Sequence, residues 1–484
     1  MPPINVSAVS SAPAQTAADT RVVPLFEGEP LAEAELQALV DLGEARAGVG
    51  KVAVDHEDAP GGGRRRVLIA GLGKRHEVGA EAAREAAAAV AARARDLRAV
   101  SLSWDAPEGL DAPIVEGTLL RLYRFDRFKS KDEEADDDND GLESLEIAGA
   151  GVDAVRVERG RVSATAQNAA RDLQNTPANV ATPSFLAARA EQIAAEHAAL
   201  EVEVLDREAI ATRGMGAFAA VAQGTYEEPR LIVLRYTGGS NGPHLGFVGK
   251  AVTFDTGGIS LKPGAKLAEM KFDMSGGAAV LEAVNAIAAL GLPVTITAVV
   301  PSTENMPSGR SVKPGDIVTA MNGKTIEVNN TDAEGRLILA DALCYAREQG
   351  AERIVDLATL TGAIIVALGS THAGLFSNDD DWFAAVDAAA TSSGEIGWRL
   401  PLHKEYRKLV KGRYADLDNA PEGRKASSIT AAEFLHAFVG EVPWVHIDIA
   451  GTAWDLDRPY ISGKAAGFGT RLLIELAGQS AVGV

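Results

Sequence analysis

The sequence has little of what disulfide-linked and membrane proteins need. It contains one cysteine in 484 residues, so no disulfide can form within the chain, as is usual in a reducing compartment. No uncharged apolar run reaches the roughly 20 residues that a membrane-spanning helix requires. The N-terminal residues lack the basic and apolar regions of a secretory signal. We therefore expect a cytoplasmic protein without a membrane partner.

Basic clusters and histidine motifs are also scarce. The formal net charge is −20, whereas nucleic-acid binding relies on clustered Lys and Arg. Nucleic acid is therefore not expected as the main partner. The eight histidines form no HExxH or H-x₃-H pair, which argues against a histidine-rich zinc site. The lone thiol, Cys344, lies in an apolar helical pattern and is expected to be an inert core residue.

The N-terminal part of the chain alternates strand and helix patterns. Residues 64–73 predict a buried strand that ends at glycine, residues 80–97 an Ala-, Glu- and Arg-rich helix, and residues 99–104 a further strand. This alternation is typical of an α/β domain with a parallel sheet. We assign residues 21–150 to this domain, and we expect the Ala-, Ser- and Pro-rich residues 1–20 to form a flexible tail.

An acidic segment lies near the end of this domain, and a helical pattern follows the domain. Seven acidic residues crowd the segment 130–141. A like-charge block is typical of a solvated loop. This one lacks the glycine and the apolar residues that separate the acids of a calcium-binding loop. Residues 151–176 have a helical pattern that ends before Pro177, and we predict that they form a connecting helix.

Alternation resumes over the larger C-terminal domain, residues 177–484. Its strand candidates are 200–205, 230–236, 244–252, 294–300, 353–359 and 444–450, and its helix candidates include 276–290 and 334–349. Strands that alternate with helices predict a mainly parallel sheet covered on both faces. The fold class is therefore α/β, with a smaller N-terminal α/β domain and a larger C-terminal one.

Polar residues follow three of these elements, and open α/β sheets bind ligands beyond the carboxyl ends of their strands. The first group is Lys250 and Asp255, followed by paired glycines and then Lys262. Paired glycines let the backbone turn sharply and approach a ligand. An ordinary strand end with a surface lysine would explain this segment equally well.

The second and third groups stand at helix starts. Asp273 precedes one helix, and helix capping explains it adequately. Asp332, Glu334 and Arg336 crowd the entrance of another, where capping accounts for one or two acids but not for all three residues. The acids supply hard oxygen ligands suited to Mg²⁺, Mn²⁺ or Zn²⁺, and clustered carboxylates can bridge two metals.

The same acids leave another enzyme class open. Metallophosphoesterases also use two metals, but they usually recruit histidines, and none lies near these acids in the sequence. The spacing alone does not establish one site, because the three groups are far apart in the chain.

Several segments resemble hallmark stretches of the leucyl aminopeptidase family, also called cytosol aminopeptidases. They are NTDAEGRL (330–337), GKAVTFDTGGISLKP (249–263), MKFDMSGGAAV (270–280), DLATLTGA (356–363) and HIDIAGTAW (446–454). The resemblance covers roughly residues 155–480. The N-terminal part is similar only in general character.

The resemblance implies two divalent metal ions per subunit, Mn²⁺ or Zn²⁺, with Mg²⁺ or Co²⁺ as alternatives. The implied ligands are Lys250, Asp255, Asp273, Asp332 and Glu334, of which Asp255 and Glu334 bridge the two ions. It also implies that Arg336 holds a bicarbonate ion and that Lys262 faces the substrate carbonyl.

The family's pocket for the first side chain of the substrate maps onto a further set of residues. They are Met270, Thr359, Leu360, Gly362, Ala450 and Ala453. Ala453 stands where many members carry a larger residue, which leaves the preferred side-chain size open.

The implied function is release of N-terminal leucine and other residues from peptide substrates by metal-activated water. The implied assembly is a homohexamer, a dimer of trimers. The alternative is the same fold with an additional DNA-binding or regulatory role, against which the acidic charge speaks.

Overall fold

The computed structural model describes residues 4–130, 141–149, 151–239, 242–423 and 425–481. The chain divides into two compact α/β units. Unit 1 comprises Met1–Asn168 and Asp457–Gly463, and unit 2 comprises Ala169–Leu456 and Lys464–Val484. The acidic segment expected to be a solvated loop falls on residues 131–140, outside the described residues. Among the described residues, no helix is both long and apolar enough to cross a membrane.

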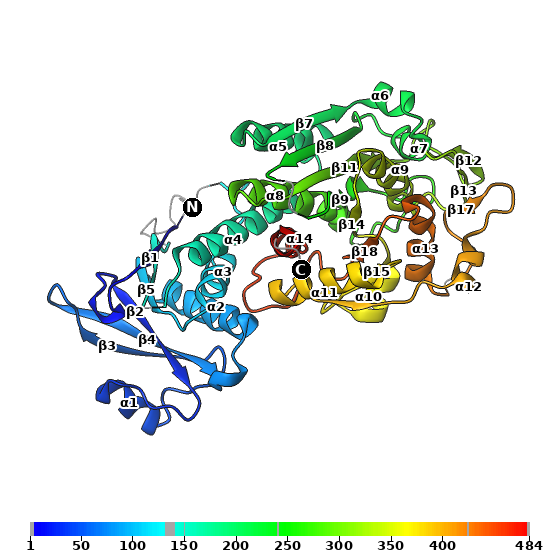
Figure 1. Ribbon diagram of the computed structural model, residues 1–484. Helices are drawn as coiled ribbons and strands as arrows, with labels where there is room; N and C mark the ends of the chain where they lie inside the picture. Colours follow the sequence, from blue (N-terminus) through cyan, green and yellow to red (C-terminus); the bar gives the residue numbers. More distant parts are fainter. Residues whose placement is uncertain (1–3, 131–140, 150, 240–241, 424, 482–484) are drawn as a thin grey trace. The chain divides into compact units, whose positions relative to one another are not determined.

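Unit 1 is built on a six-stranded sheet with helices on both faces (Figure 1). In spatial order the strands are β1 (Asn5–Val9), β6 (Ser144–Ala148), β5 (Ser101–Asp105), β2 (Thr20–Phe26), β4 (Arg64–Gly73) and β3 (Val52–Asp58). The helices are α1 (Ala34–Asp41), α2 (Ala80–Asp96) and α3 (Asp111–Arg121). Neighbouring strands are parallel apart from β3, which runs antiparallel to β4. Successive side chains of β2 point to opposite faces of the sheet. Val22 therefore packs in one core cluster with α2 and α3, whereas Val23 packs in another with α1.

The expectation of a flexible tail over residues 1–20 is wrong for β1 and for the first residue of β2. Strand β1 pairs in parallel with β6, from Asn5 opposite Ser144 to Val9 opposite Ala148. Val6 and Ala8 pack against the core cluster of unit 1. These two side chains share one face of the strand, and burying them favours the strand over a free tail despite the Ser- and Ala-rich composition.

Unit 2 contains a nine-stranded sheet that follows the predicted helix α4 (Ala154–Asn175). In spatial order its strands are β16 (Gly397–Arg399), β15 (Ala373–Ser377), β18 (Trp444–Asp448), β14 (Arg353–Ala358), β9 (Leu245–Gly249), β11 (Thr295–Asn305), β8 (Arg230–Thr237) and β7 (Leu200–Leu205), while β10 (Ala251–Asp255) pairs with β11. The central strands are parallel, and β8, β7 and β15 each take part in antiparallel pairs. The sheet is therefore mixed and mostly parallel.

Helices cover both faces of this sheet (Figure 1). One face carries α5 (Pro183–Glu196), α8 (Ser275–Ala289), α11 (Asp380–Ser393) and α14 (Thr470–Ala481), and the other carries α7 (Gly216–Ala222), α9 (Gly335–Glu348) and α13 (Ser427–Val439). The short helices α6 (Arg207–Thr212), α10 (Gly362–Leu368) and α12 (Lys404–Arg407) lie in the connections. Cys344 is buried on α9, and burial raises the pKa of its thiol to about 12, as expected of an inert core residue.

The single strand predicted over 244–252 is two strands, β9 and β10, which meet at Lys250. The last pair between β9 and β11 is Val248 with Val299, and the first between β10 and β11 is Ala251 with Ser302. Pro301 lies between these pairs and has no N–H to donate to a ladder. At the break, Lys250 donates its N–H to the Leu357 carbonyl instead. The interruption thus coincides with the first residue of the predicted site.

A small third sheet supports the loop that precedes α9. It consists of β12 (Asp316–Thr319), β13 (Thr325–Val328) and β17 (Leu417–Asp418). Strand β13 pairs in parallel with β17, so the residues that follow each strand emerge side by side. Residues 329–334 follow β13 and Asn419 follows β17, which brings these two segments together.

Candidate metal centre

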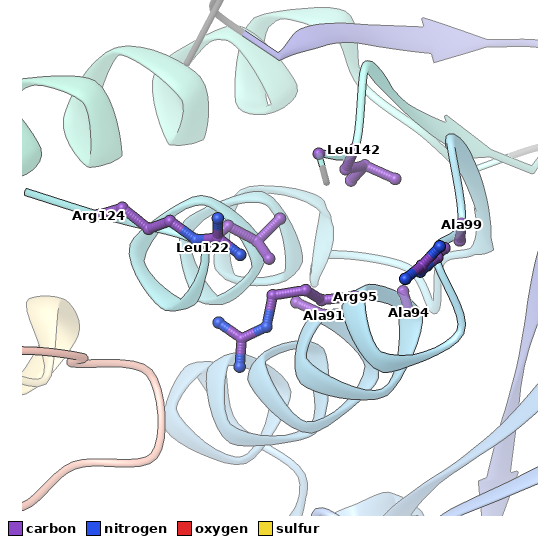
Figure 2. A pocket seen from close by; sticks show the side chains of 9 residues that line it. Ala91, Ala94, Arg95, Ala99, Leu122, Arg124 and Leu142 are labelled. Carbon is purple, nitrogen blue, oxygen red and sulfur yellow. The ribbon is translucent and has the colours of Figure 1, made fainter. Parts of the chain in front are cut away.

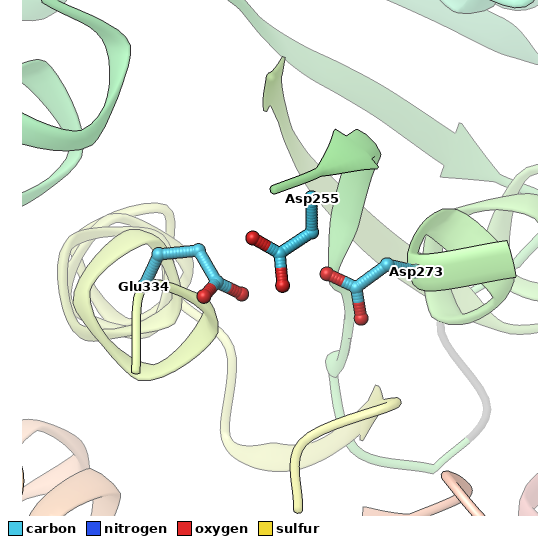
Figure 3. Close-up of side chains that lie close together, drawn as sticks. All are labelled: Asp255, Asp273 and Glu334. Carbon is cyan, nitrogen blue, oxygen red and sulfur yellow. The ribbon is translucent and has the colours of Figure 1, made fainter. Parts of the chain in front are cut away.

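Three buried carboxylates from three different elements converge in unit 2. Asp255 ends β10, Asp273 lies in the 3₁₀ helix η3 (Leu267–Met274), and Glu334 directly precedes α9. One oxygen of each lies within 4.8 Å of the others, and Figure 3 shows the three side chains pointing toward one another. Residues from the three separate sequence motifs therefore meet at one point.

Lys250 lies against two of these carboxylates. Its Nζ is 2.8 Å from Asp273 Oδ1 and 2.8 Å from Glu334 Oε1, and it donates to the Thr359 carbonyl at 3.0 Å. Burial opposes the charge on the amine, but the carboxylates of Asp273 and Glu334 outweigh it and raise the Lys250 pKa above its ordinary value. With only protein groups around it, Lys250 is an ammonium.

Asp332 joins the cluster through Lys262. The Lys262 ammonium lies 2.8 Å from Asp255 Oδ2 and 2.5 Å from Asp332 Oδ1. Burial and the charge of Glu334 raise the pKa of Asp332 to about 6, and Lys262 opposes that rise. Burial also raises the pKa of Asp273 well above its ordinary value. The cationic groups of the protein therefore do not fully neutralise the negative charge of these carboxylates.

Glycine makes the close approach of these groups possible. A Cβ on Gly335 would come 2.7 Å from Lys250 Nζ, so any larger residue there would displace the amine. Gly257 and Gly258 have φ values of +85° and +62°, which favour glycine. They turn the chain between Asp255 and Lys262, as the paired glycines in the sequence predicted.

Asn305, which the sequence analysis did not select, orients two of the carboxylates. Its Nδ2 donates to Asp255 Oδ1 at 2.8 Å and to the Thr331 carbonyl at 3.0 Å, and it lies 3.5 Å from Glu334 Oε2. Asn305 ends β11, which runs five residues beyond the predicted end at Val300. A polar residue at the carboxyl end of a central strand was the available signal for Asn305.

Arg336 is buried beside the cluster with part of its guanidinium unused. Its Nη1 donates to the Asn419 carbonyl at 2.5 Å, and its Nε has no hydrogen-bond partner among the described residues. Burial lowers the pKa of Arg336 to about 10. Asn419, also missed from the sequence, accepts from the N–H groups of Asn329 and Asn330, and so holds the loop that carries Asp332 and Glu334.

The residues that resemblance assigned to a substrate pocket all lie in unit 2. Thr359, Leu360 and Gly362 follow β14, Ala450 and Ala453 follow β18, and Met270 lies in η3. Thr359 Oγ1 donates to Asp273 Oδ1 at 2.7 Å, which links this group to the carboxylates. Gly362 is exposed, Met270 and Leu360 are half-buried, Thr359 and Ala450 are buried, and Ala453 has no exposed surface.

The donor set fits divalent metal ions. Asp273 Oδ2 is buried and has no hydrogen-bond partner among the described residues. A buried carboxylate oxygen is normally paired or bound to a metal. Four carboxylates, together with the Lys250 amine once it has lost a proton, supply oxygen and nitrogen donors suited to Mn²⁺, Zn²⁺ or Mg²⁺.

A hollow in unit 1 is too small for the nucleotide-like ligand that an α/β domain can bind. Figure 2 shows Ala91, Ala94 and Arg95 of α2 beside Leu122 and Arg124, which follow α3. The cavity has a volume of about 10 Å³, which is close to the minimum for one water molecule.

Comparison with known proteins gives a consistent result over both units. The family model "Cytosol aminopeptidase family, catalytic domain" matches residues 168–474, and that family's N-terminal domain model matches residues 22–132. A "Probable cytosol aminopeptidase" of Solibacter usitatus (strain Ellin6076) is 46% identical and is aligned over 96% of this chain and 97% of its own length. One from Roseiflexus castenholzii (strain DSM 13941 / HLO8) is 44% identical over 98% of each chain.

The chain is also similar to a solved structure. The "Bottromycin maturation enzyme BotP in complex with Mn" has a TM-score of 0.86 and 34% sequence identity, and the alignment covers 96% of this chain and all of that one.

Proposed function

The chain belongs to the cytosol aminopeptidase family, and we propose that it removes N-terminal amino acids, leucine among them, from peptides with the help of two divalent metal ions. Family membership makes it a peptidase and hydrolase. The metal dependence is supported by the convergence of Asp255, Asp273 and Glu334 and by a buried Asp273 oxygen that has no partner among the described residues.

The proposed metal ligands are the five residues predicted from the sequence. One ion would be held by Lys250, Asp255, Asp273 and Glu334, and the other by Asp255, Asp332 and Glu334. Lys250 can coordinate only after its ammonium has lost a proton, so metal binding releases that proton. We favour Mn²⁺ because a similar protein has been solved in complex with Mn. Zn²⁺, Mg²⁺ and Co²⁺ remain alternatives.

When bound, the ions would polarise the scissile carbonyl and acidify a water molecule. Lys262, freed from its ion pairs with Asp255 and Asp332, would direct its ammonium at the negative charge that develops on the carbonyl oxygen. Arg336 would hold a bicarbonate ion, since its buried Nε lacks a partner among the described residues. The half-buried Met270 and Leu360 would contact the first side chain of the substrate, together with the rest of the predicted pocket.

Two further proposals follow from family membership and resemblance. We propose that the chain assembles as a homohexamer, a dimer of trimers, and that it acts in the cytoplasm.

A chelation and reloading experiment tests the function. The protein is treated with EDTA, dialysed, and assayed with leucine p-nitroanilide before and after addition of Mn²⁺. We expect activity to disappear and then return. An assay with p-nitrophenyl phosphate on the same sample addresses the metallophosphoesterase alternative. Phosphatase activity without anilide hydrolysis, or anilide hydrolysis that survives complete removal of metal, would contradict the proposal.

A further inference from the structure

Asp448 is a fully buried carboxylate that the proposed mechanism does not use. It is the last residue of β18, where it pairs with Ala358 of β14 on one side and with Gly374 of β15 on the other. The segments that leave β14 and β18 directly beyond it are 359–362 and 450–453. These segments contain five of the six residues proposed to form the pocket for the first side chain.

The Asp448 carboxylate bonds to both segments. Its Oδ1 accepts from the N–H groups of Leu360 at 3.2 Å, Thr361 at 3.4 Å and Ala450 at 3.2 Å. Its Oδ2 accepts from Thr361 Oγ1 at 2.6 Å. A single buried side chain therefore ties together two stretches of backbone that are about 90 residues apart in the sequence.

The Asp448 carboxylate sets which group donates in each hydrogen bond of this network. Thr361 has one hydroxyl proton and gives it to the carboxylate, so Ser428, whose Oγ lies 2.7 Å from Thr361 Oγ1, must be the donor in that pair. Thr361 Oγ1 also accepts from the Ile364 N–H and so caps α10. The direction of each bond, and the start of α10, thus depend on the acceptor at position 448.

The same backbone is held from its other side by the metal centre. Lys250 donates to the Thr359 carbonyl, and Thr359 Oγ1 donates to Asp273. The segment from 359 to 361 is therefore fixed between the carboxylate cluster and Asp448. Removal of Asp448 would leave the segments after β14 and β18 without their shared acceptor, while the bonds to Lys250 and Asp273 would remain.

We infer that Asp448 is a positioning residue that fixes the two walls of the pocket for the first side chain, and that it thereby sets which N-terminal residues the enzyme prefers. The inference rests on the proposed function. It differs from a purely structural role because it concerns the choice between substrates rather than folding alone.

A nearby carboxylate provides a matched control. Asp356 is also fully buried, on β14, and its carboxylate accepts from Trp444 Nε1 at 2.6 Å and contacts His446 Nδ1 at 2.6 Å. Those two partners lie within β18, before the pocket segments begin. Loss of Asp356 should thus weaken the sheet without releasing either pocket wall.

The test compares steady-state kinetics of Mn²⁺-loaded Asp448→Ala, Asp448→Asn and Asp356→Ala with those of the unmodified protein, using leucine and alanine p-nitroanilides. We expect Asp448→Ala to change the leucine-to-alanine ratio of kcat/KM by about tenfold, the scale of a small change in a side-chain pocket. The change should lie mainly in KM, with metal content unaltered. Asn keeps an oxygen acceptor, so Asp448→Asn should largely restore the ratio, and Asp356→Ala should leave it unchanged.

Two outcomes would overturn the inference: a folded Asp448→Ala protein with an unchanged ratio, or an equal change in Asp356→Ala. If Asp448→Ala does not fold, Thr361→Val and Thr361→Ser decide instead. Valine removes the hydroxyl that donates to Asp448 and serine keeps it, so the ratio should shift in the former only, and equal ratios would refute the inference. An unmodified protein without aminopeptidase activity would refute the proposed function, and the inference with it.

Discussion

Each unit of this protein contains a cluster of charged side chains with buried members, and the two clusters differ in their balance of positive and negative groups. In unit 1, the arginines Arg21 and Arg65 face Glu33 and Glu57, with contacts of 2.5–2.7 Å. In unit 2, ion pairs join four carboxylates to the two ammonium groups of Lys250 and Lys262. Among the side chains joined by these ion pairs, positive and negative groups are equal in number in the first cluster, whereas negative groups are in excess in the second.

The difference separates a cluster that stabilises the fold from one that is suited to bind cations. Buried charges are costly unless they are paired, and the unit 1 cluster meets that condition with protein groups alone. The unit 2 cluster does not, and burial raises the pKa values of Asp255 and Asp273. Added divalent ions would supply the missing positive charge. Four predictions test this comparison.

The largest effect is expected for Asp255→Asn. The substitution keeps the shape of the side chain but removes a charge from the position proposed to bridge both metals. Activity should fall by more than the roughly 100-fold that is typical for loss of a partner outside the ligand sphere, and metal content measured by elemental analysis should fall with it. An Asp255→Asn protein with full activity would discredit the two-metal proposal.

Lys262→Ala should reduce turnover by roughly 10²–10³, as for loss of an oxyanion donor. Because the amine is proposed to act on the substrate rather than on the metals, metal content should stay at the wild-type level. Lys262→Arg keeps the positive charge and is the matched control. A parallel loss of metal and activity in Lys262→Ala would instead place Lys262 in a purely structural role.

Metal affinity should weaken as pH falls. The carboxylates raise the pKa of Lys250, so its ammonium competes with metal over the accessible pH range, and affinity should fall about tenfold per pH unit for one displaced proton. Below about pH 6, protonation of Asp332 should steepen the decline, since a carboxylate with a raised pKa loses its charge as pH falls through that value. Equilibrium dialysis between pH 5 and 9 measures this, and a flat profile would exclude Lys250 as a ligand.

The smallest effect on activity is expected in unit 1. Glu57→Gln removes the charge that faces the buried Arg21 and Arg65, which should cost about 2 kcal/mol of unfolding free energy, the scale for loss of hydrogen bonds to charged groups. Urea denaturation measures the loss. Metal content and kcat should not change. A change in metal content would contradict the proposal that only the unit 2 cluster binds metal.

The carboxylates that converge in unit 2 were selected from the sequence, whereas the residues that orient them were not. Asp255, Asp273 and Glu334 stand at strand ends and helix starts, within segments that resemble family hallmarks, so each had a local signal. Asn305 and Asn419 have none of comparable strength. Their roles arise from contacts with residues far away in the chain, as when Asn419 binds the backbone of Asn329 and Asn330.

The elements of the fold followed a similar pattern. Many core strands and several long helices, such as α2, α8 and α9, were predicted from apolar patterning, whereas β2, β6 and β15 were not. Strand β1 was missed because its two inward side chains, Val6 and Ala8, are a weak signal in a Ser- and Ala-rich context. The break at Lys250 was also missed. It depends on Pro301 of a neighbouring strand and on the Leu357 carbonyl, which only tertiary structure brings close.

Counting bound metal tests the central claim most directly. Wild-type protein and an Asp273→Asn variant are dialysed against Mn²⁺ at pH 8, and the metal per chain is measured together with hydrolysis of leucine p-nitroanilide. The account predicts two ions per wild-type chain, fewer in the variant, and activity that follows occupancy. Full hydrolysis by a chain that binds no metal would contradict it.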